Sequence, residues 1–159
     1  MKPIFTRPAT PEDIFSVAPR LRAADHDEVF AAGGMPPLPT LLHQYQAGAD
    51  MHAAGIVELD RPEVLYGCDP VYGYPQVGVI WMLGTDTIFD HPVEFTITSR
   101  RIFNEFHERF EVLTNYVDAR NERHIKWLKW LGCRFLRRVD HYGPFSFPFL
   151  EFASVRLCA

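Results

Sequence analysis

The chain has 159 residues, a length typical of one domain, and 47% hydrophobic, 14% aromatic and 23% charged residues indicate a folded protein rather than a disordered one. A formal net charge of −4 argues against general binding to nucleic acid. The N-terminus has no apolar signal segment, and no apolar run is long enough to span a membrane. We therefore expect a single domain over residues 1–159, a cytoplasmic location and no membrane association.

Cysteine and histidine are spaced in ways that argue against disulfides and metal sites. Cys68, Cys133 and Cys158 are far apart and form no C-x-x-C pair, so we expect reduced thiols. The seven histidines form no H-x-H or H-E-x-x-H motif. The sequence therefore predicts no bound metal.

The first half of the chain combines helical and strand patterns. Thr10 followed by Pro11 marks a helix start, because a hydroxyl caps the first turn and proline suits the first helical position. Pro19 is expected to kink or shorten that helix. Further short helices are predicted over residues 27–32 and 38–47. The strand candidates, of which the last two form a hairpin around Asp60-Arg61-Pro62, are 3–7, 54–59 and 63–67.

The second half contains the strongest periodic signals. The continuous apolar run 77–83 predicts a strand buried on both faces. The range 98–110 has an apolar stripe at helical spacing and predicts a buried helix face. The range 121–131 predicts another helix, capped by Asp118 or Asn121 and ended by Gly132. The remaining strand candidates are 112–119, 133–139 and 148–157.

The element order is β-α-α-(α)-β-β-β-α-β-α-β-β, in which the helix in parentheses is residues 38–47. This order predicts an α/β (α+β) fold. We expect a central, mostly antiparallel twisted sheet of about six or seven strands, with helices on both faces.

Positive charge is concentrated near the C-terminal helix. The basic residues of segment 120–138 are Arg120, Arg123, Lys126, Lys129, Arg134, Arg137 and Arg138. A solvated helix face with its neighbouring strand explains them, and so does a local surface for an anionic ligand, an acidic protein or nucleic acid. Trp127 and Trp130 cannot both face inward with Leu128 and Leu131. At least one tryptophan is therefore expected at the surface, where this residue is enriched in interfaces.

Three stretches resemble the GCN5-related N-acetyltransferase (GNAT) superfamily. Residues 7–13 (RPATPED) are similar to the strand-to-helix junction that opens its fold. The range 77–83, followed by 98–110, stands in the place of the family's central strand and cofactor-binding helix. Residues 121–133 (NERHIKWLKWLGC) resemble its C-terminal helix, with Cys133 where phenylalanine is usual. The resemblance implies the GNAT fold across essentially the whole chain.

A narrower resemblance, to small bacteriophage-encoded GNAT-like proteins, rests on residues 81–85, 115–121 and 127–132. Some of those proteins are described as acetyltransferases and others as internal virion proteins. The first kind implies transfer of an acetyl group from acetyl-CoA to an amine of a small molecule or protein. The second implies a non-catalytic protein of the host cytoplasm or the virion, which binds a phage or host protein through Trp127, Trp130 and the basic segment.

The resemblance also assigns a cofactor site. The residues it places against acetyl-CoA are Met82, Leu83, Gly84, Ser99, Arg100, Arg101 and Asn121. The central-strand backbone would hold the pantetheine arm and polarise the thioester carbonyl. The start of the following helix would meet the diphosphate. For Asn121, a helix-capping role is an equally good explanation.

Two departures from the family pattern bear on catalysis. The stretch 95–103, which stands for the glycine-rich diphosphate loop of active members, contains no glycine. Leu128 occupies the position where many members have a tyrosine as general acid, which leaves Tyr116 as a nearby candidate. The candidate general bases are Glu58 and His124. Two hypotheses therefore stay open, an N-acyltransferase and a GNAT-fold protein without catalysis.

Overall fold

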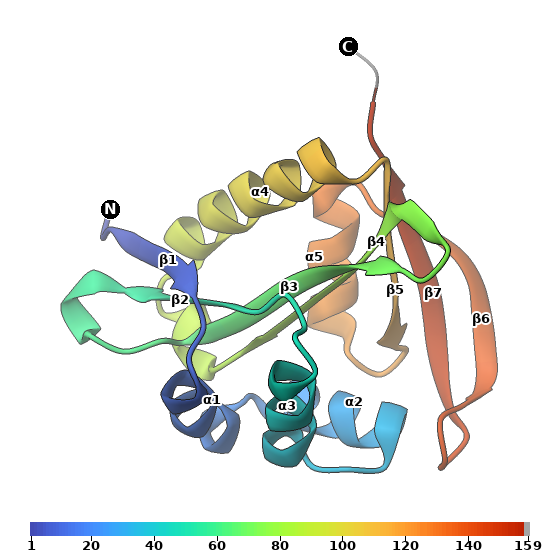
Figure 1. Cartoon of the computed structure of the whole chain (residues 1–159), viewed down its shortest axis with the longest axis horizontal. Helices are drawn as coiled ribbons and strands as arrows, with labels where there is room; N and C mark the ends of the chain where they lie inside the picture. The colour runs from blue at the N-terminus through green and yellow to red at the C-terminus, as the bar shows by residue number, and fades with distance from the viewer. Residues whose placement is uncertain (158–159) are drawn as a thin grey trace.

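The computed structural model describes residues 1–157, built around a seven-stranded sheet in the order β1-β2-β3-β4-β5-β7-β6 (Figure 1). Every neighbouring pair is antiparallel except β4 and β5. The strands are β1 Ile4–Pro8, β2 His52–Ile56, β3 Val64–Val71, β4 Tyr74–Gly84, β5 Val112–Asp118, β6 Arg134–Tyr142 and β7 Phe147–Val155. The predicted fold class and mostly antiparallel sheet are confirmed.

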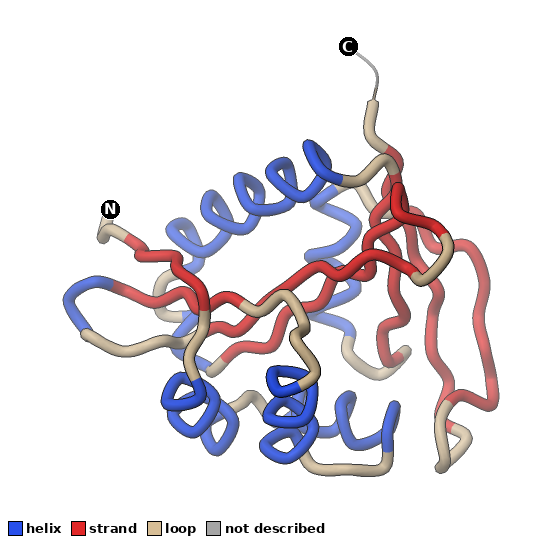
Figure 2. Tube along the Cα trace, viewed as in Figure 1, coloured by secondary structure: helices blue, strands red, loops and turns tan. Residues whose placement is uncertain are grey.

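Helices cover both faces of the sheet. Helices α1 to α3 lie on one face, and α4 and α5 lie on the other (Figures 1 and 2). The α-helices are α1 Pro11–Val17, α2 Ala23–Gly33, α3 Pro37–Gln46, α4 Pro92–Arg109 and α5 Glu122–Leu131. The short 3₁₀ helices are η1 Ala18–Arg20, η2 Val57–Leu59 and η3 Asp86–Phe89. Within residues 1–157, none of these helices is both long and apolar enough to cross a membrane.

The start of α1 follows its sequence signals. The backbone N–H of Thr10 donates to Asp13 Oδ2 at 2.8 Å, and Pro11 occupies the first helical position. Pro19 lies in η1, so the α-helix ends before it and the chain continues as a tighter turn. The predicted shortening at this proline is confirmed.

The predicted start of α4 is wrong. The sequence pattern placed it at residue 98, whereas the helix begins at Pro92. The apolar stripe marks only the buried part of the helix, because Pro92 and Val93 are exposed and Glu94 is polar. As a consequence, Ser99 to Arg101 lie inside the helix, where backbone N–H groups bond to preceding carbonyls instead of to a ligand.

Two apolar clusters form the core, one on each face of the sheet. Phe103, Phe106 and Phe110 are buried in the cluster on the α4 and α5 side, as the helical stripe predicts. Ile14 and Leu41 belong to the cluster beneath α1 and α3. The sheet thus packs against a layer of helices on each of its faces.

The cysteines of the described chain are buried. Burial raises the pKa of the Cys68 and Cys133 thiols to about 12, so neither is a thiolate near neutral pH. Both are free of disulfides. Cys158 lies outside the described residues.

The sheet opens between its two parallel strands. Strands β4 and β5 pair only at Val77–Val112, Gly78–Leu113 and Val79–Thr114. Beyond this point the amide of Asn115 donates to the Ile80 carbonyl at 2.7 Å, in place of a backbone bond. The divergence separates the edges of β4 and β5 and positions the site described next.

Candidate functional site

A cavity of about 550 Å³ occupies the region where β4 and β5 diverge. This volume is within the range of small-molecule sites. Its lining is mostly apolar and comes from both faces of the sheet. Residues that represent its walls are Val29, Ala32 and Leu41 from α2 and α3, and Phe95, Phe103, Phe106, Trp127 and Leu128 from α4 and α5.

The backbone of Met82 faces this opening. Ile80 accepts its bond from Asn115 on the β5 side, and the N–H of Gly84 donates to Asp25 Oδ2 at 2.8 Å, also away from β3. Alternate residues of an antiparallel strand direct their N–H and C=O groups to the same side. Met82 lies midway between these two residues, so it presents one donor and one acceptor to the cavity.

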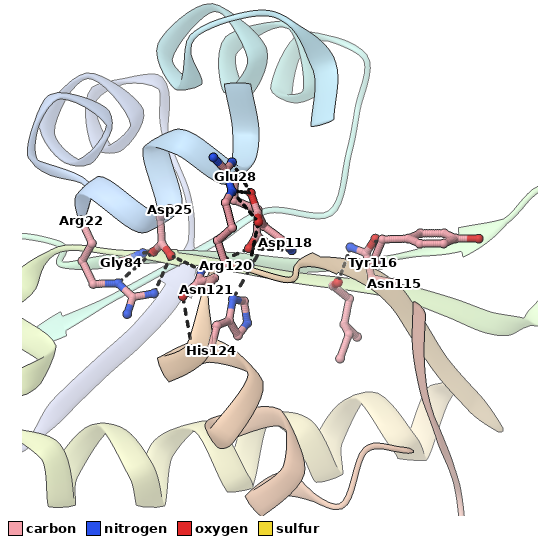
Figure 3. A network of polar contacts seen from close by, with 11 residues as sticks. Arg22, Asp25, Glu28, Gly84, Asn115, Tyr116, Asp118, Arg120, Asn121 and His124 are labelled. Atoms are coloured by element: carbon pink, nitrogen blue, oxygen red, sulfur yellow. Dashed lines mark hydrogen bonds and ion pairs between the residues drawn. The ribbon is translucent and has the colours of Figure 1, made fainter. Parts of the chain in front are cut away.

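A buried polar network joins the start of α2 to the junction between β5 and α5 (Figure 3). Arg22 and Asp25 form an ion pair, with 3.1 Å between Nε and Oδ2. The side-chain amide of Asn121 donates to Glu28 Oε2 at 3.1 Å and to Asp25 Oδ1 at 3.4 Å. Asn121 Oδ1 also caps α5 by accepting the N–H of His124. One asparagine thus fixes both the helix start and the two acids.

Glu28 has a strongly perturbed carboxyl group. Asp25 is paired with Arg22, and Asp118 is paired with Arg120 at 2.6 Å, but the carboxyl of Glu28 has only N–H donors at Oε2. Its side chain is 14% exposed. Burial, together with the neighbouring Asp25 and Asp118 carboxylates, raises the pKa of Glu28 to about 8. Near neutral pH this carboxyl is therefore mostly protonated.

His124 lies opposite Glu28 on the cavity wall. Its Nδ1 is 3.9 Å from Glu28 Oε1, too long for a hydrogen bond. Burial lowers the pKa of His124 to about 4, so the imidazole is neutral near neutral pH. Among residues 1–157, Nδ1 is buried without a hydrogen-bond partner. Glu28 Oε1 and His124 Nδ1 are thus neighbours that do not bond to each other.

Only some of the predicted cofactor-binding residues line the cavity. Met82, Leu83 and Ser99 line the cavity. Gly84 lies just beyond it, with its N–H bonded to Asp25 and its C=O accepting the N–H of Arg22. The Ser99 hydroxyl accepts the Trp127 indole N–H at 3.2 Å, which ties α4 to α5.

The two predicted phosphate-binding arginines make contacts within the protein. Arg100 donates to the carbonyls of Trp130 at 2.5 Å and Leu131 at 2.9 Å, so it caps the end of α5. Arg101 pairs with Glu105 at 2.9 Å on the exposed side of α4. In neither contact does the arginine side chain bind to the first turn of α4, where a diphosphate would be held.

The loop before α4 is acidic. Asp86 begins η3, Asp90 follows η3 two residues before Pro92, and Glu94 lies in the first turn of α4. Glu94 Oε1 accepts the backbone N–H of Lys2 at 3.0 Å. Carboxylates at this position oppose the binding of a diphosphate to the helix N-terminus.

The predicted proton-transfer residues fall into two places. Glu58 is in η2, 58% exposed and paired with Lys2 at 2.9 Å, away from the cavity lining. Tyr116 lines the cavity, with its ring 4.9 Å from that of Tyr142 and its hydroxyl 3.4 Å from Arg137. His124 lines the cavity as well. The structure brings Tyr116 and His124, but not Glu58, to one site.

Sequence reasoning identified neither Glu28 nor the role of Asp25. Helix α2 has no side-chain cap, and Asp25 binds Arg22 and the N–H of Gly84. A signal was present, because Arg22, Asp25 and Glu28 recur every three residues along one side of α2. A charged stripe toward the sheet indicates a buried network rather than a solvated face.

Comparisons with known proteins identify the fold. No protein-family model matches the sequence, and no curated protein matches it. Solved structures do match, among them the ribosomal-protein-alanine N-acetyltransferase of Brucella melitensis (TM-score 0.71, 13% identity, 96% of this chain and 99% of that one).

Two further similar structures are a GNAT-family acetyltransferase of Bacillus anthracis (TM-score 0.74, 11% identity, 98% and 95% of the two chains) and the ribosomal-protein-S18-alanine N-acetyltransferase of Escherichia coli (TM-score 0.72, 12% identity, 99% and 96%). These likenesses span nearly the whole of each chain but at low identity, so they establish architecture rather than activity. The chain has the GNAT fold.

Proposed function

We propose that the protein is an N-acyltransferase of GNAT type, which transfers an acyl group from a pantetheine thioester such as acetyl-CoA to an amine. The observation that carries this proposal is the opening between β4 and β5, where the Met82 backbone faces an apolar cavity of about 550 Å³. The GNAT fold of the chain supports it.

The residues of the opening fit the acyl-pantetheine end of such a donor. The arm is narrow and carries amide groups, which the N–H and C=O of Met82 would bind as a strand edge does. An acyl thioester bound there supplies a carbonyl carbon open to attack by nitrogen. A backbone N–H directed at the carbonyl oxygen would stabilise the charge that develops on it.

The diphosphate end of CoA requires a different anchor from the usual glycine loop. Asp90 lies two residues before the start of α4 and Glu94 lies in its first turn, where a glycine loop would be expected. Arg123 lines the cavity, and its guanidinium lies 4.3 Å from the centre of the Phe89 ring in η3. We assign Arg123 as the cation that meets the donor's phosphates, with the arm providing most of the affinity.

The thiolate leaving group needs a proton. Leu128 is fully buried and has no proton to give. Tyr116 and Tyr142 both line the cavity, and burial raises the pKa of Tyr142. The Tyr142 hydroxyl suits the role of general acid, because it stays protonated near neutral pH, and Tyr116 is the second candidate by its position.

Calorimetric titration with acetyl-CoA and acetyl-pantetheine tests this proposal. We expect saturable binding of both, with affinities within about tenfold of each other because the arm is the shared part. Arg123→Glu should weaken acetyl-CoA binding but not acetyl-pantetheine binding, whereas Arg101→Glu serves as the matched control and should change neither. No binding of either thioester at millimolar concentration would overturn the proposal.

A second candidate is a partner-binding protein with the GNAT fold and no catalysis. Arg123, Lys126 and Lys129 are exposed on α5, and Trp130 beside them is 47% exposed. Such a face suits an acidic protein surface, and the resemblance to phage proteins would make that partner a virion or host protein. Binding of a partner that Lys126→Glu abolishes, together with no thioester binding, would favour this candidate.

A further inference from the structure

The network beside the cavity has one more carboxyl than it has cations. Within the described chain, Asp25 pairs with Arg22 and Asp118 pairs with Arg120. Glu28 accepts hydrogen bonds at Oε2 from uncharged N–H groups. The titratable or charged groups facing Glu28 are Asp25, Asp118, Arg120, His124 and Tyr142. A buried carboxyl without a cation stays protonated, and a bound cation would ionise it.

The Oε1 atom of Glu28 lies opposite a buried nitrogen that has no hydrogen-bond partner among the described residues. Oε1 is 3.9 Å from His124 Nδ1, which is buried and has no hydrogen-bond partner in residues 1–157. A buried nitrogen without a partner, such as His124 Nδ1 in the described part of the chain, is rare in protein interiors. One nitrogen that donates two hydrogen bonds would satisfy both, because a primary ammonium carries three donors and both atoms act as acceptors.

The cavity walls beside Glu28 indicate what kind of body the ligand has. Glu28 lines the cavity beside Val29 and Ala32 of the same helix, and Leu41 of α3 adjoins them. These walls offer apolar surface and no second carboxylate. They suit a ligand with one charged end and a hydrocarbon body, because a second charge would lose its hydration without gaining a partner.

We propose that Glu28 and His124 form the acceptor site of the enzyme, which binds a primary amine with an apolar body by its ammonium group. This inference rests on the proposed function, since it names the acceptor and the group that activates it. Glu28 is the proton acceptor, and His124 positions the nitrogen.

The proton balance follows from these roles. The Glu28 carboxylate takes one proton from the ammonium, which leaves a neutral amine with a lone pair. The nitrogen–carbon bond then forms at the thioester carbonyl as the carbon–sulfur bond breaks. A second nitrogen-bound proton ends on the departing sulfur, and the proton on Glu28 leaves to solvent when the next ammonium binds and ionises the carboxyl. Each turnover therefore releases one proton and yields an amide and a thiol.

A titration of the wild-type protein with n-hexylamine, without any thioester, tests the site directly. The side-chain carboxyl carbon of Glu28 is followed by ¹³C NMR near neutral pH. We expect its signal to move from the protonated to the ionised position as the amine binds. An unchanged signal at saturating amine would overturn the inference.

Variants and ligand analogues test the specificity of the same site. Glu28→Gln should weaken n-hexylamine binding by at least about tenfold, because it removes the negative charge. Asp27→Asn is the matched control, since Asp27 is the preceding residue of α2 and its side chain is 68% exposed. We expect 1-hexanol to bind wild type and Glu28→Gln alike, and 1,6-diaminohexane to bind wild type more weakly than n-hexylamine.

The two proposals fail in different ways. Binding of acetyl-pantetheine without any response of Glu28 to amine would overturn the acceptor site and leave the acyltransferase standing. Ionisation of Glu28 by n-hexylamine without thioester binding would support the amine site and overturn the acyltransferase. Equal amine affinities of wild type and Glu28→Gln would overturn the inference even if amines bind elsewhere.

Discussion

Folding shifts the pKa values of Glu28 and His124 in opposite directions, and these shifts make the free energy of unfolding depend on pH. The pKa of Glu28 is raised to about 8, so the folded state holds a proton that the unfolded chain loses above about pH 4.3. The pKa of His124 is lowered to about 4, so the unfolded chain binds the extra proton below about pH 6.5. The two effects oppose each other below that pH.

Above about pH 6.5, of this pair only Glu28 contributes, and its contribution is lost as the pH rises through about 8. We expect the free energy of unfolding to fall by about 1–2 kcal/mol between pH 6.5 and 8. Glu28→Gln should remove this decline, as urea denaturation at several pH values would measure. A decline of equal slope in the variant would contradict the assignment, and Asp27→Asn should keep the wild-type slope.

At the scale of elements, Arg100 connects the middle of α4 to the end of α5. Its guanidinium donates to the carbonyls of Trp130 and Leu131 and lies 4.2 Å from the centre of the Trp130 ring. These carbonyls are among those that a helix leaves unpaired at its C-terminus, where a cation also stabilises the helix dipole. Arg100 therefore has a structural role between the two helices.

Arg100→Ala should lower the free energy of unfolding by about 1–2 kcal/mol, since it removes charge-assisted bonds to a helix end. Arg101→Ala is the matched control, because its exposed pair with Glu105 is expected to contribute less than about 0.5 kcal/mol. Thermal unfolding of both variants measures the difference. Equal stability of the two would show that the helix-end contact does not stabilise the protein.

For the molecule as a whole, the junction of β4 and β5 determines where the sheet opens. Gly78 lies in the short paired region, and a Cβ there would come within 2.5 Å of Cys68 Sγ and 2.8 Å of the Phe110 ring. The close approach of the two core side chains requires glycine. Strand pairing and the opening beyond it thus depend on this packing.

Gly78→Ala should cost about 1–3 kcal/mol of stability, because the added methyl overpacks the core. Gly33→Ala makes the same chemical change in α2, where the space is open, and should be neutral or stabilising. Urea denaturation of both variants gives the comparison. A Gly78→Ala protein as stable as Gly33→Ala would show that the core yields more easily than its contacts indicate.

The sequence by itself determined the element order and, with it, the fold. Helix starts at Thr10-Pro11 and Asn121, and the stop at Gly132, are local signals that depend on backbone hydrogen bonding within a few residues. The continuous apolar run 77–83 indicated β4, and the apolar stripe at helical spacing in 98–110 indicated the buried face of α4. The polar beginning of α4 has no such pattern, and its start was therefore predicted too late.

The candidate site was only partly accessible from the sequence. Met82, Ser99, Tyr116 and His124 were singled out and lie at the cavity, while their roles stay predictions. Glu58 was chosen from its position in a hairpin, yet its side chain pairs with Lys2 on the surface. Resemblance identifies positions along the chain but not where each side chain points.

Only the tertiary structure decided the chemistry of the site. Glu28 and Asn121 are 93 positions apart in the chain, and the packing of α2 beside the end of β5 brings them into contact. Their charges and solvation depend on neighbours contributed by separate elements, and burial is what raises the pKa of Glu28 and lowers that of His124. Local sequence determines hydrogen bonding along the backbone, whereas the desolvation of a side chain depends on everything that packs around it.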